Sequence, residues 1–506
     1  MSEAFMKLIK SFSVLALITV ITQLLMMVRN MLMANHFGVS AEMDSYNLAN
    51  VLTVSTMGIV SAAVTTILIP LLSNLDDSKE KRESINTFIT VLGLFSLFLS
   101  LLFFIFGYPL ISLFTPGQAS EIQVLTFQLT LILSISQLFK VYTGISTAFL
   151  QTNEDFINPK MATLLASMVS LSYFIFSASP NIYAITIVLG VSFIVEAIYI
   201  AIKQRKIAFE LKLCLKFSNP TFKLLMKNTV PIILSSAAFQ ASLVVSNFIA
   251  SYFGTGYVSI FGYGNQIVNI FHSLIILNII MMLYPNLARK FDESIDSAKK
   301  SLVTYINLTN LLVIPIVFGF IAVGDIIIEI LFERGNFSSE NTQQVYLMSA
   351  ILFLSFPINT VRDYIYRSFY CLNDTRTPSR NSLFVVVINI ILIVILIPVV
   401  KVYAIAIGPV LSSIISLLLS YNKLKRKIGP LDSSKQMIKN HCILTLNGLL
   451  MCLVVIGFKG VLMNLDLYPI IELFILVIIG GLIFISISYF TQKKLIFGML
   501  KNKKDS

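Results

Sequence analysis

This 506-residue sequence has few charged residues. Only 12% are Asp, Glu, Lys or Arg, whereas 56% are hydrophobic, and the mean hydropathy is +0.86. A soluble globular domain carries about twice that share of charge, so the composition excludes an ordinary soluble protein. The sequence is typical of a polytopic membrane protein.

Cysteine and histidine are also scarce, with four and three copies. None of the cysteines falls in a predicted outer loop, and their spacings show no pairing pattern, so we expect no disulfide framework. The histidines lie too far apart along the chain to suggest a metal site. We therefore expect neither disulfides nor a metal cofactor.

Catalytic motifs are missing too. The chain has no GxSxG elbow, no Walker loop and no HExxH pattern. We therefore expect a transporter rather than an enzyme, with no bound cofactor and no ATP-driven step in this chain. Coupling to a monovalent cation or to the membrane potential stays open as the source of energy.

Long apolar runs dominate what is present, and each is long enough to cross a bilayer. The first, from Ser11, lacks a cleavage site and is predicted to be a retained helix. We predict an all-α protein with about fourteen membrane-spanning helices. The runs cover residues 11–34, 46–72, 86–107, 123–150, 160–179, 181–202, 229–253, 258–284, 301–323, 345–371, 381–399, 402–421, 442–464 and 468–490.

The positive charges predict the orientation. With the N-terminus in the cytoplasm, 30 of the 37 Lys and Arg fall in cytoplasmic segments and only Arg334, Lys401 and Lys459 in outer loops. This asymmetry is a strong positive-inside signal, and it predicts cytoplasmic N- and C-termini. The net charge of +12 therefore reports topology, and we expect no nucleic-acid partner.

Short motifs recur at offsets of 215 to 220 residues. HFG at 36–38 matches YFG at 252–254, LFTPG at 113–117 matches LFERG at 331–335, and FLQTNEDFINP from Phe149 matches FYCLNDTRTP from Phe369. An even number of helices per repeat predicts two six-helix lobes of the same orientation, followed by a terminal helix pair. The predicted divisions are residues 1–205, a basic amphipathic linker at 206–228, 229–425 and 426–506.

The stretch between the predicted lobes, residues 203–227, carries seven Lys or Arg among apolar residues. Asn219 followed by Pro220 is a good helix start. The segment FKLLMK from Phe222 would then form an amphipathic hinge on the inner membrane face. An ordinary solvated basic loop is the alternative for residues 203–216.

Few polar side chains fall inside the apolar runs. Arg29 lies in the first run, with Asn30 beside it and Gln23 two turns earlier. Because an arginine at mid-membrane depth costs roughly 3 kcal/mol, such a residue usually faces a cavity or a partner. The alternative is that Arg29 reaches the outer headgroups from the last turns of its helix.

Two further polar stripes occur in the second half of the chain. In the eighth run Asn265, Asn269 and His272 share one face, with Gln266 beside it. These side chains would face the interface between the lobes, or simply hydrogen-bond neighbouring helices.

The second stripe lies in the tenth run and contains Asn359, Arg362, Asp363 and Arg367. Because Arg362 is adjacent to Asp363, we expect it to be free for an anion. For Arg367 the alternative is that it and Asp363, at i,i+4, neutralise each other. Lys140 and Glu196, near cytoplasmic helix ends, are expected to snorkel.

Taken together, RNMLMANHFGVSAEMDSY from Arg29, ILIPLLSNL from Ile67, the LFTPG and LFERG loops and FYCLNDTRTPSRNS from Phe369 resemble the MurJ (MviN) family of lipid II flippases. This family belongs to the multidrug/oligosaccharidyl-lipid/polysaccharide (MOP) exporter superfamily. The resemblance covers roughly residues 10–425.

The resemblance implies fourteen helices and a location in the bacterial plasma (inner) membrane. The implied substrate is lipid II, a polyprenyl-diphosphate-linked glycan used for peptidoglycan and cell shape, carried to the outer leaflet by alternating access. Cell-wall or polysaccharide synthesis enzymes are potential partners.

The resemblance carries over Arg29 as a substrate-anion residue and Asp44 as an acidic position at the outer end of the first helix. Other family charges are replaced: the first-helix pattern reads Gln23, Met26, Arg29 and Asn30, and residues 51–69 carry no charge. In the eighth run the family's tyrosine-alanine-aspartate-arginine reads Tyr263 to Gln266.

We therefore expect Arg362 and Arg367 to supply replacement charge, because arginine offers forked donors to phosphate oxygens. The predicted substrate-binding set is Arg29, Arg362, Arg367, Asn30, Gln23, Gln266, Asn269 and His272, with Asp44 and Asp363 as structural or gating candidates. A less cationic cavity would also suit a capsular or exopolysaccharide unit. A cation-coupled multidrug antiporter is a further alternative.

Overall fold

The computed structural model describes residues 3–63, 68, 72, 79–116, 118–177, 179–205, 212–431, 434–462, 465 and 467–493. All regular secondary structure in these ranges is helical. The all-α prediction is therefore confirmed for this part of the chain. Each predicted apolar run overlaps at least one helix, but the run 46–72 ends partly outside the described residues. The runs 258–284 and 345–371 each cover more than one helical element.

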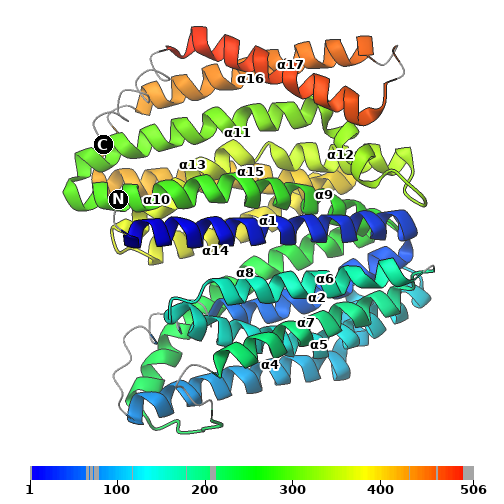
Figure 1. The fold of residues 1–506 in the computed structure, drawn as a ribbon, viewed down its shortest axis with the longest axis vertical. Coiled ribbons are helices and arrows are strands. Elements are labelled where there is room, and N and C mark those ends of the chain that lie inside the picture. Colours follow the sequence, from blue (N-terminus) through cyan, green and yellow to red (C-terminus); the bar gives the residue numbers. More distant parts are fainter. Residues whose placement is uncertain are drawn as a thin grey trace. The chain divides into compact units, whose positions relative to one another are not determined.

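The first group of helices ends before Phe253 and runs largely side by side in Figure 1. It begins with the 35-residue α1. The bounds are α1 Glu3–Phe37, α2 Ala41–Ala63, α4 Lys79–Phe114, α5 Ser120–Thr152, α6 Ile157–Phe176, α7 Ile182–Gln204 and α8 Pro220–Tyr252.

The second group begins with a helix that changes type at its centre, where the π-helix η2 separates two α-helical parts. The bounds are α9 Tyr257–Phe271, η2 His272–Ile276, α10 Leu277–Glu293, α11 Ile295–Phe332, α12 Ser339–Phe353, α13 Phe356–Cys371, α14 Arg376–Val400, the short 3-10 helix η3 Lys401–Tyr403, α15 Ala404–Ile428, α16 Ser434–Leu462 and α17 Pro469–Thr491.

Among the described residues, fourteen helical segments result if α9, η2 and α10 are counted together, α12 is joined to α13 and η3 is joined to α15. Eleven stretches of the described residues are long and apolar enough to cross a membrane, one of them joining α14 to α15. α2 and α8 are not among those eleven. The chain is a multi-pass membrane protein, and the number of fourteen spans stays a prediction.

Chain contacts divide the protein into two compact units, Met1–Ser259 and Ile260–Ser506. α8 packs against α2 and α4 and therefore belongs to the first unit, although the repeat predicted it as the start of the second lobe. The side chain of Asn219 caps α8 by accepting a hydrogen bond from the N–H of Thr221, so the predicted helix start is confirmed. Phe222–Lys227 form the first turns of the continuous helix α8, and their place on the inner membrane face stays a prediction. Residues 206–211 of the predicted linker lie outside the described residues.

Two connecting turns share one backbone conformation. The turn from α5 to α6 has Glu154 at φ 61° and Asp155 donating its N–H to Leu150. The turn from α13 to α14 has Asn373 at φ 56° and Asp374 donating to Phe369. Each aspartate also accepts the N–H three residues later, as a helix N-cap does. The shared geometry, 219 residues apart, supports the predicted repeat.

The terminal pair packs against α11 within the second unit (Figure 1). Their buried core contains Ile314 and Phe318 of α11 and Met451 of α16. Gly448 allows close approach there, because a Cβ would lie 2.4 Å from the Phe318 ring. The Lys459 ammonium also pairs with the Asp325 carboxylate. The pair α16–α17 is thus bound along the length of α11.

Candidate functional site

Asp44 lies in the first turn of α2 and is completely buried. Its carboxylate accepts hydrogen bonds from the N–H of Gly256 at 2.5 Å and from the N–H and hydroxyl of Ser259 at 2.7 and 2.5 Å. These donors lie at the start of α9, where free N–H groups and the helix dipole favour a negative charge. Asp44 therefore caps a helix from a distant part of the sequence.

A second group of hydrogen bonds supports the same turn. The side-chain N–H of Gln118 donates to the Ser251 carbonyl at 3.4 Å, and its carbonyl accepts from the Thr255 hydroxyl at 3.3 Å. The Ser251 hydroxyl donates to the carbonyl of Phe114 at 2.8 Å. The α8–α9 turn is thus held by α2, the end of α4 and the α4–α5 loop.

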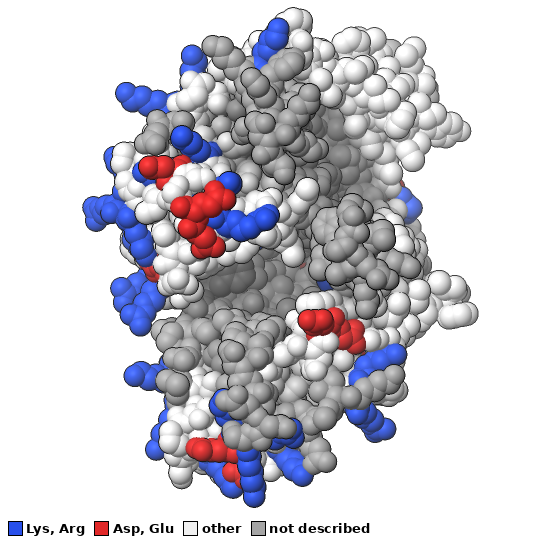
Figure 2. Space-filling model, turned by 60° about the vertical axis from the view of Figure 1, so that its left-hand side comes forward, with Lys and Arg blue, Asp and Glu red and all other residues white. Residues whose placement is uncertain are grey.

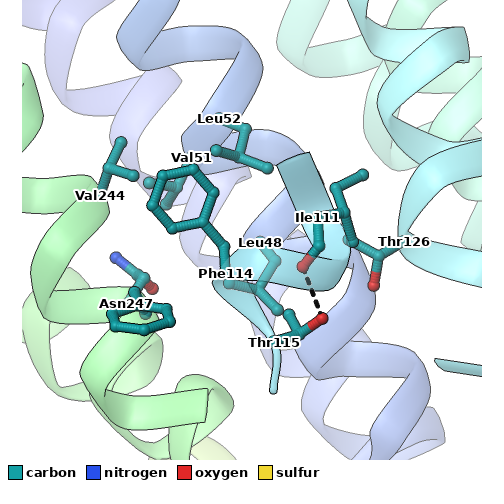
Figure 3. A pocket seen from close by; sticks show the side chains of 10 residues that line it. Leu48, Val51, Leu52, Ile111, Phe114, Thr115, Thr126, Val244 and Asn247 are labelled. Carbon is teal, nitrogen blue, oxygen red and sulfur yellow. Dashed lines mark hydrogen bonds between the residues drawn. The ribbon is translucent and has the colours of Figure 1, made fainter. Parts of the chain in front are cut away.

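A small apolar cavity lies between α2, α4, α5 and α8 (Figure 3). The Phe114 and Phe248 rings meet edge to face at its wall, with centroids 5.7 Å apart. Asn247, Thr115 and Thr126 are the polar residues among those that line it, and none is charged. A site with this lining does not suit a diphosphate, and none of the predicted substrate residues lines it.

The predicted residues of α1 lie on one unbroken helix. Arg29 and Asn30 are half-buried and interact, because the Arg29 guanidinium donates two hydrogen bonds to the Asn30 side-chain carbonyl, at 3.1 and 3.4 Å. Within the described part of the chain, no carboxylate pairs with Arg29. Gln23 is half-buried as well. The Arg29 charge is therefore not neutralised by the residues that surround it.

His272, Gln266 and Asn269 lie on α9 or where it passes into η2. Asn269 is exposed, and the other two are partly buried. The His272 ring lies 6.0 Å from that of Phe356 at the start of α13 and is within electrostatic reach of Arg362 and Asp363. π-helical turns often mark functional sites. The structure thus brings His272 near two of the predicted residues of α13, which the sequence could not establish.

On α13 the ion pair is not the one that spacing suggested. Arg362 pairs with its neighbour Asp363, with 3.1 Å between Nη2 and Oδ1, and its Nε donates to the same oxygen at 3.4 Å. Arg367 instead lies over the Tyr284 ring of α10, 4.8 Å from the centroid. Among the described residues, no carboxylate forms an ion pair with Arg367. The unneutralised cation of α13 is therefore Arg367.

Lys140 and Glu196 were each expected to extend to the headgroup region, but they contact each other instead. Their Nζ and Oε2 atoms lie 2.5 Å apart, and the Glu196 side chain is 4% exposed. The Thr163 hydroxyl donates to the other Glu196 oxygen at 3.4 Å, and Lys140 lies over the Phe193 ring. This ion pair joins α5, α6 and α7 inside the first unit.

Sequence reasoning missed Tyr284, and also Tyr366, which lies under the Arg362 guanidinium at 5.6 Å. The contact with Tyr366 could have been predicted from spacing, because Tyr366 lies four residues after Arg362 and residues at i,i+4 are neighbours on a helix. Tyr284 is far from Arg367 in sequence, and no local pattern predicts that contact.

The long apolar helices are those of a multi-pass membrane protein. Comparison with known proteins shows that its class is a transporter rather than an enzyme. A family model described as lipid II flippase MurJ matches residues 33–478. The probable lipid II flippase MurJ of Rickettsia prowazekii is 25% identical over 435 residues, which cover 84% of this chain and 85% of that protein. Its counterpart in Buchnera aphidicola subsp. Acyrthosiphon pisum is 24% identical over 454 residues, covering 85% and 86%.

Solved structures show the same fold. A lipid II flippase MurJ in an inward closed conformation superposes with a TM-score of 0.82 at 23% identity, covering 95% of this chain and 99% of that one. An inward-facing multidrug resistance MATE transporter of the MOP superfamily superposes with a TM-score of 0.65 at 12% identity, covering 82% and 96%. The chain belongs to the lipid II flippase MurJ family.

Proposed function

We propose that this protein moves lipid II from the inner to the outer leaflet of the bacterial plasma membrane. The family match over residues 33–478 carries this proposal. Lipid II joins a prenyl chain to a glycan through a diphosphate, so the carrier needs cations for the diphosphate and can leave the prenyl chain in lipid. Neither an exopolysaccharide unit nor a drug is favoured by the similar proteins.

Arg29 and Arg367 are the cations we assign to the diphosphate. Neither is neutralised by a carboxylate in the described part of the structure, and arginine can donate paired hydrogen bonds to phosphate oxygens. Gln23, Asn30, Gln266, Asn269 and His272 would add hydrogen bonds to the glycan or the phosphates. Arg362 would join them only when it leaves Asp363.

Asp44 is proposed to be a gating residue. Its buried bonds to Gly256 and Ser259 hold the turn before α9 against α2, within the first unit. A turn at residues 253–259 that changes conformation when this contact breaks would fit alternating access. Asp363 would play a parallel part by holding Arg362 until substrate arrives.

The energy source is proposed to be the membrane potential or a monovalent cation, since the chain has no nucleotide-binding motif. Cell-wall synthesis enzymes would consume the product at the outer surface. Dissipating the membrane potential in cells that depend on this protein should stop transport; continued transport would favour cation coupling alone.

The test is complementation of cells depleted of their own lipid II flippase, with wild type, Arg29→Ala and Arg29→Lys at matched membrane levels. Wild type should restore growth and Arg29→Ala should not, while Arg29→Lys should restore it partly because the charge remains. A wild type that reaches the membrane and fails would indicate a different lipid-linked glycan.

A further inference from the structure

Residues 212–219, which precede α8, run back along α4. The N–H groups of Lys212, Cys214 and Lys216 donate to the side chains of Asn86, Thr90 and Thr87, at 3.2, 3.2 and 3.3 Å. After this contact the Asn219 side chain donates to the Glu80 carbonyl at 3.3 Å. The segment therefore rises beside α4 as far as Thr90 and then returns to the first turn of the helix.

The residues of this segment alternate as in an extended chain, in which successive side chains point to opposite sides. Every second residue directs its N–H to α4, and the residues between direct large apolar side chains outward. Leu213 is 94% exposed, Leu215 54% and Phe217 55%. We call residues 212–217 the apolar strip.

The strip continues an apolar face of α4. Counting from Thr90, the exposed residues of α4 recur at helical spacing, and each is 44% to 55% exposed. They are Leu94, Leu97, Phe98 and Leu101. Since α4 is long and apolar enough to span a membrane, we expect lipid chains to cover this face. The strip extends the same lipid-facing surface toward the start of α4.

The depth of the strip also indicates lipid. Thr90 lies 11 residues beyond Lys79, which is about 16 Å along the helix axis, and about 6 Å inside the predicted start of the span at residue 86. Irregular backbone exposed to lipid is not tolerated in the hydrocarbon itself. The headgroup layer is the depth at which water can reach the backbone while the apolar side chains still meet acyl chains.

The basic side chains beside the strip agree with this depth. Lys216 pairs with Glu83 at 2.8 Å, and this contact raises the pKa of the Lys216 ammonium. Lys212 and Lys223 lie on either side and are exposed. Basic groups beside an apolar strip are typical of segments that bind membranes with anionic lipid on their cytoplasmic side.

We propose that the apolar strip is a lipid-binding element, inserted into the headgroup layer of the leaflet at which α4 begins. The charge distribution predicts that this is the inner leaflet. Through the strip, the chain just before α8 is held by α4 on one side and by phospholipid on the other. The proposal rests on residence in the membrane and does not require lipid II as substrate.

Tryptophan fluorescence can test this directly, because the natural chain contains no tryptophan. Leu213→Trp in the full-length protein would report on the strip alone. Lys79→Trp at the start of α4 and Leu101→Trp on its lipid-facing side are the matched controls. Each variant would be placed in phosphatidylcholine–phosphatidylglycerol vesicles that contain a quenching lipid, brominated either near the glycerol or near the chain end. Iodide, which quenches from the water phase, would be added on both membrane faces.

Lipid brominated near the glycerol should quench Leu213→Trp at least twice as strongly as Lys79→Trp, and iodide should quench it less. Lipid brominated near the chain end should quench Leu101→Trp more than Leu213→Trp. Quenching by iodide alone would place the strip in the cytosol, and protection from both quenchers would mean that protein covers it; either result overturns the proposal. Leu215→Trp gives the same comparison if Leu213→Trp does not fold.

Discussion

The buried carboxylate of Asp44 holds both the backbone N–H and the hydroxyl of Ser259, at 2.7 and 2.5 Å, across 215 positions of sequence. The contact also neutralises the positive end of α9, since the helix dipole places partial positive charge at that terminus. This one side chain therefore fixes where α2 meets the turn before α9.

Asp44→Ala should lower the thermal unfolding midpoint and impair transport. The substitution leaves two buried N–H groups and a hydroxyl without an acceptor, at a cost of about 1–3 kcal/mol for each unsatisfied group. Glu42→Ala is the control, because Glu42 is an exposed acid in the same turn. Melting of the purified proteins in detergent checks this, and equal midpoints for the two variants would contradict it.

Arg367→Ala should impair rescue of flippase-depleted cells more than Arg362→Ala does. The Arg367 charge lies over an aromatic ring, whereas Arg362 already has a carboxylate partner. Growth would be scored at equal membrane levels, with Arg367→Lys and Arg362→Lys separating charge from geometry. The reverse order would show that Arg362 leaves Asp363 to bind the substrate.

Lys459→Met should destabilise the second unit, by less than the roughly 3–5 kcal/mol lost when a fully buried ion pair is broken. The ammonium and the Asp325 carboxylate are mostly buried, with 18% and 23% of their side chains exposed, and an uncompensated charge would remain. The double variant Lys459→Met/Asp325→Asn should recover part of that loss. Melting of all four members of the cycle measures the coupling, and additive effects would contradict a direct interaction.

The ion pair between Asp374 and Lys427, at 2.8 Å, should make stability depend on acid pH. Lys427, with the Thr377 contacts, lowers the pKa of Asp374 from 3.8 to about 2. Because the carboxylate is favoured in the folded state, its contribution is complete above pH 3.8 and is lost as the pH falls toward 2.

Comparison of Asp374→Asn with wild type at a series of pH values tests this dependence. The difference in unfolding midpoint should be constant at neutral pH and vanish near pH 2. Since surface pairs contribute at most about 1 kcal/mol, the difference should be small. A difference that grows as the pH falls would contradict the assignment.

The helices could be predicted because a bilayer needs about 20 apolar residues. The same rule underestimates the length of the helices. The predicted apolar run covers only residues 301–323, whereas α11 covers Ile295–Phe332. The extra turns contain polar residues that hydropathy does not recognise. Hydrogen bonding along the backbone, rather than burial in lipid, sets where such a helix ends.

The pairs within the candidate site were less predictable. The Arg362 side chain is long enough to reach the carboxylate of its neighbour Asp363. The i,i+4 spacing rule pointed instead to Arg367 as the partner of Asp363. Asp44 was expected at the outer end of the first helix, but it lies in the first turn of α2. Its partners Gly256 and Ser259 are more than 200 residues away, and no local pattern identifies them.

The most direct test of the account is lipid II transport by the purified full-length protein in vesicles. With lipid II initially in one leaflet, the wild type should transfer it to the other leaflet, and Arg29→Ala and Arg367→Ala should slow the transfer at least tenfold without unfolding. A folded wild type that leaves lipid II in place while moving another polyprenyl-diphosphate glycan would contradict the proposed substrate. Transfer by Arg29→Ala at the wild-type rate would contradict the proposed site.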